Sequence, residues 1–335
     1  MEEKFSALRE LVGRMAGQRL PGERELAEQL QVSRPTLRAW LDILEQEGSV
    51  QRRQGSGTYA VNVQAGPALR SISLLIDASL KLGDDPFISL LVDQLLASIQ
   101  AEHMQCSIER ISSSGQAPLR LRDGAILIGQ AGQALIQRIS APGIPIVCML
   151  LTSEVTSHAR VSILQTADRE AGAESAASLL RAGCQQLLFI GKQEVSASWE
   201  RWQGAQQAAQ QAGSEIAFRS CSLNYQAGLQ MGRELAETQT SARRGIIVTN
   251  DWLALGVRTG LLGKGIPLEQ SPLVSFDGLP MTEDPALGIA SLQIPIATMA
   301  EDAIKELQRL ARHRLPAGRA VRYPLSWRPE QGPIL

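Results

Sequence analysis

The chain has 335 residues, 44% of them hydrophobic, which suits two or three domains with a substantial core. The formal net charge of −1 does not indicate a nucleic-acid partner, so any such partner must be sought in local patches. No apolar run reaches the roughly 18 to 20 residues that span a bilayer. The first ten residues, MEEKFSALRE, are charged and lack the apolar region of a signal peptide. We therefore expect a cytoplasmic protein without membrane contact.

The cysteines and histidines do not indicate a metal site. No two cysteines form a CxxC pair, and we interpret them as buried thiols; they are Cys106, Cys148, Cys184 and Cys221. The three histidines lie far apart, without a partner at metal-ligand spacing. GxxxxGKS/T and GxSxG motifs are absent, and Lys192 and Lys264 lack the surroundings of a cofactor lysine. We expect neither a metal nor a cofactor.

The first 63 residues are predicted to form three helices followed by a hairpin. Ser33 is a plausible N-cap of the third helix, because its hydroxyl can accept a free amide of the first turn. Leu37, Leu41 and Leu44 then form a buried stripe at i, i+4 and i+7. The expected elements are helices at 4–17 and 23–30, a third helix that ends at Gly48, and strands at 49–53 and 58–63 around a Gly-Ser-Gly turn. This order predicts a winged helix-turn-helix.

Arginines on this predicted domain are candidates for DNA binding. Arg34 and Arg38 share a face away from the leucine stripe, and Arg34 lies at the helix start, where a recognition helix meets base edges. Arginine pairs bidentately with guanine or phosphate. The candidate contacts are Arg24, Ser33, Arg34, Thr36, Arg38, Arg52, Arg53, Gln54, Gly55, Ser56 and Gly57.

The alternative is an ordinary solvated basic face. Residues 1–62 hold nine basic and nine acidic residues, so their net charge is zero. Electrostatic affinity for DNA then requires that the two signs be segregated on the folded surface.

The stretch LPGERELAEQLQVSRPTLRAWLDILEQEGSVQRRQGSGTYAV resembles the GntR-family DNA-binding domain over nearly its whole length. The resemblance implies that Arg24, Arg34 and Arg38 contact DNA, and that the wing residue before the glycine, here Gln54, enters the minor groove. Trp40 stands where the family usually has a small buried residue. We therefore expect altered packing beneath the recognition helix.

The segment 64–70, QAGPALR, is interpreted as a linker, because it contains Gly66-Pro67 and no periodic pattern. From residue 71 on, apolar strands alternate with helices, which indicates parallel sheets covered on both faces. The strands are too many for one compact sheet of this type. We therefore expect two lobes, the second from about residue 160, and an overall α/β class with two parallel sheets. The predicted domains are 1–63, the linker 64–70 and the two-lobed domain 71–330.

The expected elements of this two-lobed domain follow in chain order. Strands are predicted at 71–78, 106–111, 124–129, 144–151, 186–191, 245–250 and 272–278, and helices at 87–102, 131–139, 170–182, 199–212, 253–262 and 295–312.

Residues 70 to 330 are similar to the LacI-type, periplasmic-binding-protein-like core, and the combination resembles the architecture of arabinose repressors. The matching motifs include DGAIL at 123–127, GIPIV at 143–147, Asp168 with Gly172, RxxG at 201–204, TND at 249–251, ALG at 254–256, SFD at 275–277 and LQIP at 292–295. The resemblance implies a small effector, often a sugar, bound in the cleft between the lobes. It implies that Arg201, Asn250 and Asp277 make polar contacts to the effector. From the first lobe, Ser79 and Phe87 match positions that face the cleft, and Tyr225 is a further candidate.

These residue types suit a hydroxylated ligand. Asp277 accepts hydrogen bonds, Arg201 donates a fork of N–H groups, and Asn250 does both. All three follow or end predicted strands, where open α/β sheets bind ligands. The structural alternative is that Asn250 and Asp277 cap helices and Arg201 pairs with a core carboxylate.

Two features depart from the LacI pattern. Only 12 residues, SSSGQAPLRLRD, separate the strands CSIERI and GAILIG, too few for the helix the family has there. Met149-Leu150-Leu151 is apolar where sugar-binding members often place an acidic residue. The effector is then less hydroxylated than a hexose, or the site is partly degenerate.

The sequence therefore predicts a ligand-responsive regulator, a repressor, that binds two-fold symmetric operator DNA as a homodimer. One alternative is a DNA-binding regulator whose cleft binds no ligand. The other is a fusion to an aminotransferase-like enzyme, which the short effector half without a cofactor lysine disfavours.

Overall fold

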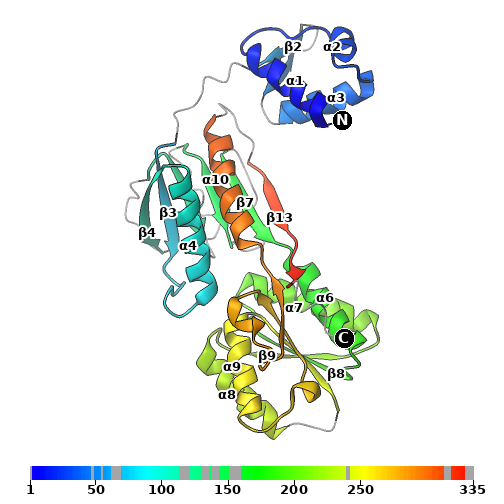
Figure 1. Cartoon of the computed structure of the whole chain (residues 1–335), viewed down its shortest axis with the longest axis vertical. Helices are drawn as coiled ribbons and strands as arrows, with labels where there is room; N and C mark the ends of the chain where they lie inside the picture. Colours follow the sequence, from blue (N-terminus) through cyan, green and yellow to red (C-terminus); the bar gives the residue numbers. More distant parts are fainter. Residues whose placement is uncertain are drawn as a thin grey trace.

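The structure is a computed structural model, which describes residues 2–46, 49–53, 56–61, 69–112, 121–129, 136, 143–150, 160–238, 242–312 and 318–328. The N-terminal domain has the predicted helices and hairpin (Figure 1). Its elements are α1 (Glu2–Arg14), α2 (Glu23–Gln29), α3 (Arg34–Gln46), β1 (Val50–Arg53) and β2 (Gly57–Ala60). The two strands pair antiparallel. The winged helix-turn-helix prediction is confirmed, while Gly48 lies outside the described residues.

The core of this domain contains the predicted leucine stripe. Leu37, Leu41 and Leu44 are buried among the apolar residues of α1, α2 and the hairpin. Trp40 is also buried, and its ring centroid lies 5.3 Å from that of Phe5 on α1. The large Trp40 side chain is thus accommodated by an aromatic contact with the first helix, directly beneath α3.

The first lobe is a six-stranded sheet with the order β13-β7-β6-β5-β3-β4, parallel throughout. One face packs against α4 and α10, which lie side by side (Figure 1). The elements are β3 (Ser71–Asp77), α4 (Pro86–Ala101), β4 (Gln105–Ile111), β5 (Gly124–Ile128), β6 (Ile146–Met149), β7 (Val161–Thr166), α10 (Ile296–Arg312) and β13 (Ala320–Tyr323). Of the helix expected at 131–139, only Ile136 is described, and it is buried against the other face.

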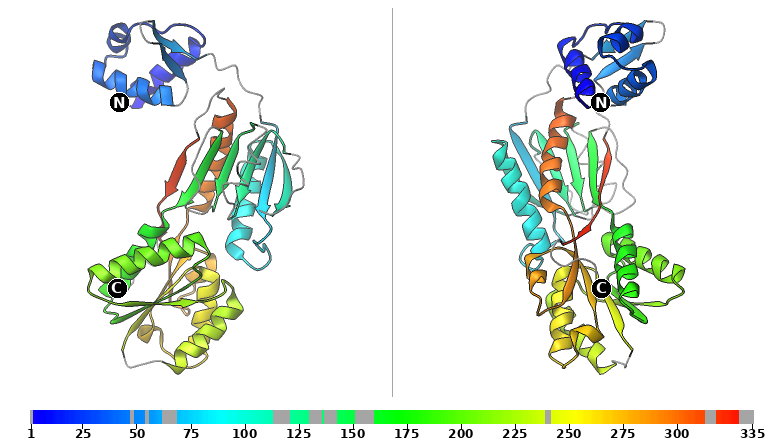
Figure 2. Two further views of the ribbon diagram at one scale, coloured as in Figure 1. Left: turned by 180° about the vertical axis from the view of Figure 1, so that it is seen from behind. Right: turned by 45° about the vertical axis from the view of Figure 1, so that its right-hand side comes forward.

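The second lobe is a second six-stranded sheet with the order β14-β12-β11-β10-β8-β9. It is parallel except for the short edge strand β14. Helices α6 and α7 cover one face, and α8 and α9 the other (Figure 2). The elements are α6 (Asp168–Arg181), β8 (Gln186–Gly191), α7 (Ser196–Gln211), β9 (Ile216–Ser220), α8 (Tyr225–Glu237), β10 (Arg244–Val248), α9 (Asp251–Leu262), β11 (Leu273–Asp277), β12 (Ile289–Gln293) and β14 (Ser326–Trp327).

The chain crosses between the lobes more than once. β7 pairs with β6 in the first sheet, so the expected start of the second lobe near residue 160 is too early. The chain enters the second lobe at α6, returns to the first with α10 and β13, and ends its described part in the second sheet with β14. Apolar alternation identifies strands but not the sheet they join, because sheet membership depends on long-range pairing.

Helix pairs in the second lobe approach closely through glycines. A Cβ added to Gly256 of α9 would lie 2.2 Å from the carbonyl oxygen of Tyr225, and one added to Gly228 of α8 would lie 2.3 Å from that of Leu253. Only residues without a side chain allow these two backbones to pack at such a distance. Among the described residues, no helix is long and apolar enough to cross a membrane.

Candidate DNA-binding surface and effector site

The start of α3 displays the predicted arginines. Ser33 caps the helix, since its Oγ accepts from the Thr36 amide at 3.2 Å and lies 2.7 Å from the Thr36 hydroxyl. Arg34, in the first turn, is exposed. Arg38 is also exposed, but its Nε donates to Glu23 Oε2 of α2 at 2.7 Å. The two arginines predicted to contact DNA bases therefore differ, because Arg38 is paired with a carboxylate of the protein and Arg34 is exposed.

The other predicted arginines also have protein partners. Arg24 Nε donates to Glu28 Oε1 at 3.2 Å on the surface of α2. The guanidinium of Arg52 pairs with Asp42 of α3, lies 3.5 Å from Glu45 Oε2, and donates to the Arg38 carbonyl at 3.2 Å. Arg52 thus attaches the first wing strand to α3.

Tyr59 of β2 contacts two other residues of the wing. The Arg53 guanidinium lies 4.7 Å from the Tyr59 ring centroid, and the Tyr59 hydroxyl is 2.7 Å from Ser56 Oγ. Gly57 has φ +110°, and a Cβ there would meet the Arg19 guanidinium at 2.8 Å. Arg19 is exposed and adds a cation at the hairpin that sequence reasoning missed. Gln54 and Gly55 lie outside the described residues.

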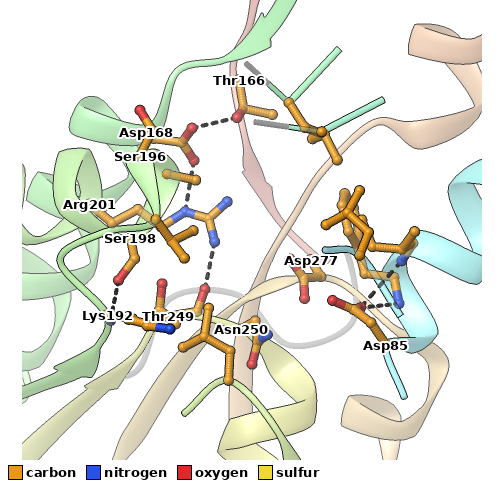
Figure 3. Close-up of a pocket in the computed structure, with 18 of the residues that line it drawn as sticks. Asp85, Thr166, Asp168, Lys192, Ser196, Ser198, Arg201, Thr249, Asn250 and Asp277 are labelled. Atoms are coloured by element: carbon orange, nitrogen blue, oxygen red, sulfur yellow. Dashed lines mark hydrogen bonds and ion pairs between the residues drawn. The ribbon is translucent and has the colours of Figure 1, made fainter. Parts of the chain in front are cut away.

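Both lobes line a cavity of about 590 Å³ (Figure 3). Five of the six predicted effector contacts lie on its wall: Ser79, Phe87, Arg201, Asn250 and Asp277. Tyr225 does not, although the preceding Asn224 does. The Tyr225 ring instead packs on Trp252, with centroids 5.3 Å apart.

Arg201 is anchored at the centre of the second-lobe wall. Its Nε donates to Asp168 Oδ1 at 2.7 Å, and its Nη1 donates to the Thr249 carbonyl at 2.6 Å. Its guanidinium carbon lies 4.5 Å from the ring centroid of Phe276. Only 4% of Arg201 is exposed, so these contacts hold the planar group in one orientation toward the cavity (Figure 3).

The carboxylates beside it are buried at the ends of second-lobe elements. Asp277 ends β11 with φ +112° and is 4% exposed; its Oδ2 accepts from the Asp251 amide at 3.3 Å. Asp251 is fully buried and accepts from Ser291 Oγ at 2.8 Å and the Leu279 amide at 2.7 Å. Burial raises the pKa of Asp251 to about 6, and burial together with the Asp251 charge raises the pKa of Asp277 well above its ordinary value.

Several predicted residues have structural partners as well as a place on the cavity wall. Asn250 caps α9, since its Oδ1 accepts from the Leu253 amide at 2.9 Å. Ser79 donates from its amide and hydroxyl to Asp77 at 2.8 and 2.7 Å. Phe87 lies in the first turn of α4, with 9% of its surface exposed. Local capping and ligand contact are compatible here, because these positions lie at the carboxyl ends of parallel strands.

Sequence reasoning missed Asp85, an acidic residue of the first lobe that lines the cavity. Asp85 lines the cavity and caps α4, accepting from the amides of Phe87 and Ile88 at 3.0 and 3.3 Å. The available signal was an aspartate directly before Pro86 and an apolar helix, which is an N-cap pattern. Leu150, from the apolar Met149-Leu150-Leu151 stretch, also lines the cavity; Leu151 lies outside the described residues.

The fold and the site define a two-lobed domain with a cavity between its lobes, joined to a winged helix-turn-helix. Residues 7–60 match the family model of bacterial regulatory proteins of the gntR family, and residues 176–329 match that of the periplasmic binding protein-like domain. The chain thus has a gntR-family DNA-binding domain at its N-terminus, followed by a periplasmic-binding-protein-like domain. This is the architecture of a transcriptional regulator.

A curated relative and several solved structures are similar to the chain. The Uxu operon transcriptional regulator of Escherichia coli (strain K12) is 38% identical over 103 residues, which are 30% of this chain and 38% of that regulator's length. A LacI family transcriptional regulator from Enterococcus faecium with bound ribose has a TM-score of 0.66 at 18% identity, covering 79% of this chain and all of that one. A transcriptional regulator CelR–cellobiose complex has a TM-score of 0.66 at 19% identity, covering 96% and 98%. At these identities the solved structures support the fold.

Proposed function

We propose that the protein is a transcriptional regulator whose affinity for operator DNA is set by a small, sugar-like effector bound between the lobes. One observation carries this proposal: a single chain joins a winged helix with an exposed arginine at the start of α3 to a cavity of about 590 Å³. A cavity of this volume falls within the range that small ligands occupy.

The way the lobes are connected supports effector control. Three segments join the two sheets: residue 167, the connection between β12 and α10, and the connection between β13 and β14. The cavity lies between the two sheets. A ligand that contacts Arg201 from one side and Phe87 from the other binds best when the lobes close on it. Such a ligand shifts the population toward the closed arrangement.

We further propose that the regulator acts as a homodimeric repressor. Two winged helices would then read a two-fold symmetric operator. Relatives support the ligand class, since the E. faecium structure carries ribose and the CelR structure carries cellobiose.

The test combines DNA binding with ligand screening on the full chain. Duplex DNA from the chain's own upstream region is titrated in a mobility-shift assay, and a thermal-shift screen uses sugars, nucleosides and sugar phosphates. A ligand at a hundredfold excess over its dissociation constant adds about 2.7 kcal/mol of stability. We expect Arg201→Ala to abolish this stabilisation and Arg34→Ala to abolish DNA binding without changing the ligand response.

Two results would contradict the proposal separately. A folded dimer without affinity for any upstream duplex contradicts the DNA-binding role. A chain that binds DNA but gains no stability from any ligand instead supports a regulator whose cleft binds nothing.

A further inference from the structure

Two carboxylates from opposite lobes face the same part of the cavity. Asp85 precedes the first turn of α4 in the first lobe, and Asp277 ends β11 in the second. Both line the cavity and lie near one another in Figure 3. The charge of Asp85 acts on Asp277 and is one of the causes that raise the pKa of Asp277.

Each of these carboxylates has an oxygen without a protein donor. In Asp277, Oδ2 accepts one long hydrogen bond of 3.3 Å, and Oδ1 accepts none from the described residues. Asp277 is nonetheless 96% buried, since only 4% of it is exposed. In Asp85, Oδ1 takes both capping amides, and no described residue donates to Oδ2. Neither oxygen is among the fully buried polar atoms without a partner, so each is open to accept a hydrogen bond from a ligand or water in the cavity.

The cations of the site offset this charge only in part, because burial raises the pKa values of Asp251 and Asp277 by more than the nearby Arg201 lowers them. Arg201 is the buried cation of the wall, and its Nε and Nη1 are already held by Asp168 and the Thr249 carbonyl. The remaining lining cations are exposed, and three have acidic partners. They are Lys192, Lys81 with Asp84 at 3.7 Å, Arg169 with Glu200 at 2.9 Å, and Arg322 with Glu170 at 3.4 Å.

The buried side of the cavity therefore has an excess of negative charge. Asp251, directly behind Asp277, adds a third carboxylate. Like charges in a low-dielectric site favour protonation, and burial raises the pKa values of Asp85, Asp251 and Asp277 in this direction. A positively charged ligand group has the opposite effect, because it stabilises the ionised carboxylates.

We propose that the effector carries a protonated amine, and that this ammonium group lies between Asp85 and Asp277 when the lobes close. This inference rests on the proposed effector site and names its ligand class, an amino sugar or a similarly small hydroxylated amine. An ammonium group has three hydrogen-bond donors and a full positive charge, whereas a hydroxyl group has one donor and no charge. Among the described residues, no group of three or more His, Cys, Asp or Glu is arranged to hold a metal ion, which favours an organic cation.

The test compares amines with their parent sugars on the full chain. Glucosamine, galactosamine and mannosamine are each paired with glucose, galactose and mannose, and glucuronate serves as an anionic probe, in thermal-shift and calorimetric titrations. We expect at least one amine to bind about tenfold or more tightly than its parent sugar, since hydrogen bonds to charged groups are worth about 1.5 to 3 kcal/mol. Calorimetry at pH 6 in two buffers of different ionisation enthalpy should detect protons released as the amine binds.

Asp85→Asn provides the specific variant, because asparagine is as good an N-cap as aspartate and should preserve α4. It is expected to remove the preference for the amine and to reduce the proton release. Asp93→Asn is the matched control, since Asp93 is an exposed residue of the same helix that does not line the cavity. It should leave both readouts unchanged.

Three outcomes would overturn the inference. A parent sugar or glucuronate that binds as well as the best amine contradicts it while leaving the effector site intact. A preference for the amine that survives in Asp85→Asn contradicts the role of the carboxylate pair. If no amine binds the wild-type chain, the inference fails, and the regulator proposal is then judged by the DNA-binding assay alone.

Discussion

Glu23 of α2 accepts a hydrogen bond of 2.7 Å from Nε of Arg38 on α3, so the carboxylate holds a predicted DNA-reading arginine in the free protein. Both side chains are partly exposed, and water and salt screen the pair. If Arg38 contacts DNA as predicted, DNA phosphates compete with Glu23 for the same guanidinium.

Replacing Glu23 with glutamine should therefore strengthen DNA binding. The change frees Arg38 and adds one unit of positive charge, and exposed pairs of this kind are worth about 0.2 to 1 kcal/mol, or up to about fivefold in affinity. Fluorescence anisotropy with an upstream duplex at two salt concentrations measures the gain, which should shrink at the higher salt. Arg38→Ala should weaken binding under the same conditions. A weaker Glu23→Gln complex would mean instead that the carboxylate orients Arg38 for its contact.

Asp42→Asn should weaken DNA binding although it removes a negative charge. Asp42 holds the guanidinium of Arg52, which connects the wing strand β1 to α3. If Arg52 acts by positioning the wing, loss of its partner moves the wing and lowers affinity, and Arg52→Ala has the same effect. If Arg52 contacts DNA directly, Asp42→Asn frees it and raises affinity. The sign of the change in anisotropy titrations decides between the two, with Glu10→Gln as a charge-matched control on α1.

Gly256→Ala should destabilise the second lobe. Its new methyl group would lie 2.2 Å from the Tyr225 carbonyl oxygen, which is backbone and moves only if α8 and α9 separate. Overpacking of this kind costs about 1 to 3 kcal/mol. Differential scanning calorimetry measures the loss. Gly83→Ala, where no atom lies within 4 Å of the added Cβ, is the control and should leave the transition unchanged. Equal melting temperatures of the Gly256 variant and wild type would show that the helices have room to relax.

Asp251 should make the protein less stable as pH rises from about 4 to 6. Burial raises its pKa to about 6 in the folded state from an ordinary 3.8, against the opposing effect of its hydrogen bonds and of Arg201. Within this window the folded chain binds more protons than the unfolded chain, so the free energy of unfolding falls with rising pH, by on the order of 3 kcal/mol. Asp277 contributes with the same sign, because its pKa is also raised.

Urea unfolding at pH 4 to 7 tests this dependence. Groups with a lowered pKa, such as Glu306, act in the opposite direction, so the useful quantity is the difference between wild type and Asp251→Asn. The variant should lose part of the fall in stability between pH 4 and 6. Parallel curves for the two proteins would rule out an effect of Asp251.

Much of the fold could be predicted from periodicity. The helix at 34–46 followed from a leucine stripe and a serine cap, and the apolar runs of β3, β5 and β8 identified buried strands. The strands β7, β9, β12, β13 and β14 and the helix α8 were missed. β9 has only intermediate and exposed positions, and such a short pattern does not separate strand from loop. In α8 two of the three buried positions are glycines, which do not contribute to an apolar stripe.

The candidate site was predicted less completely. Arg201, Asn250 and Asp277 were found through the resemblance to the LacI-type core. Asn250 and Asp277 lie at the carboxyl ends of strands that meet at the cavity, whereas Arg201 reaches it from within α7. Tyr225 was misplaced, since one residue along the first turn of a helix rotates a side chain by about 100° and directs it to Trp252. The pairs of Glu23 with Arg38 and of Asp42 with Arg52 could not be found in this way, because the partners are distant in sequence. A local N-cap pattern indicated Asp85, but not that it lines the same cavity as Asp277.

The sequence by itself determined the local elements, the winged helix and the side-chain chemistry, since caps, periodicity and turn residues act over a few positions. Only the tertiary structure decided which strands share a sheet, which arginines are held by carboxylates, and that Asp85 and Asp277 face one cavity. These relations arise from packing between segments far apart in the chain. Their energies depend on burial and distance, which no local pattern encodes.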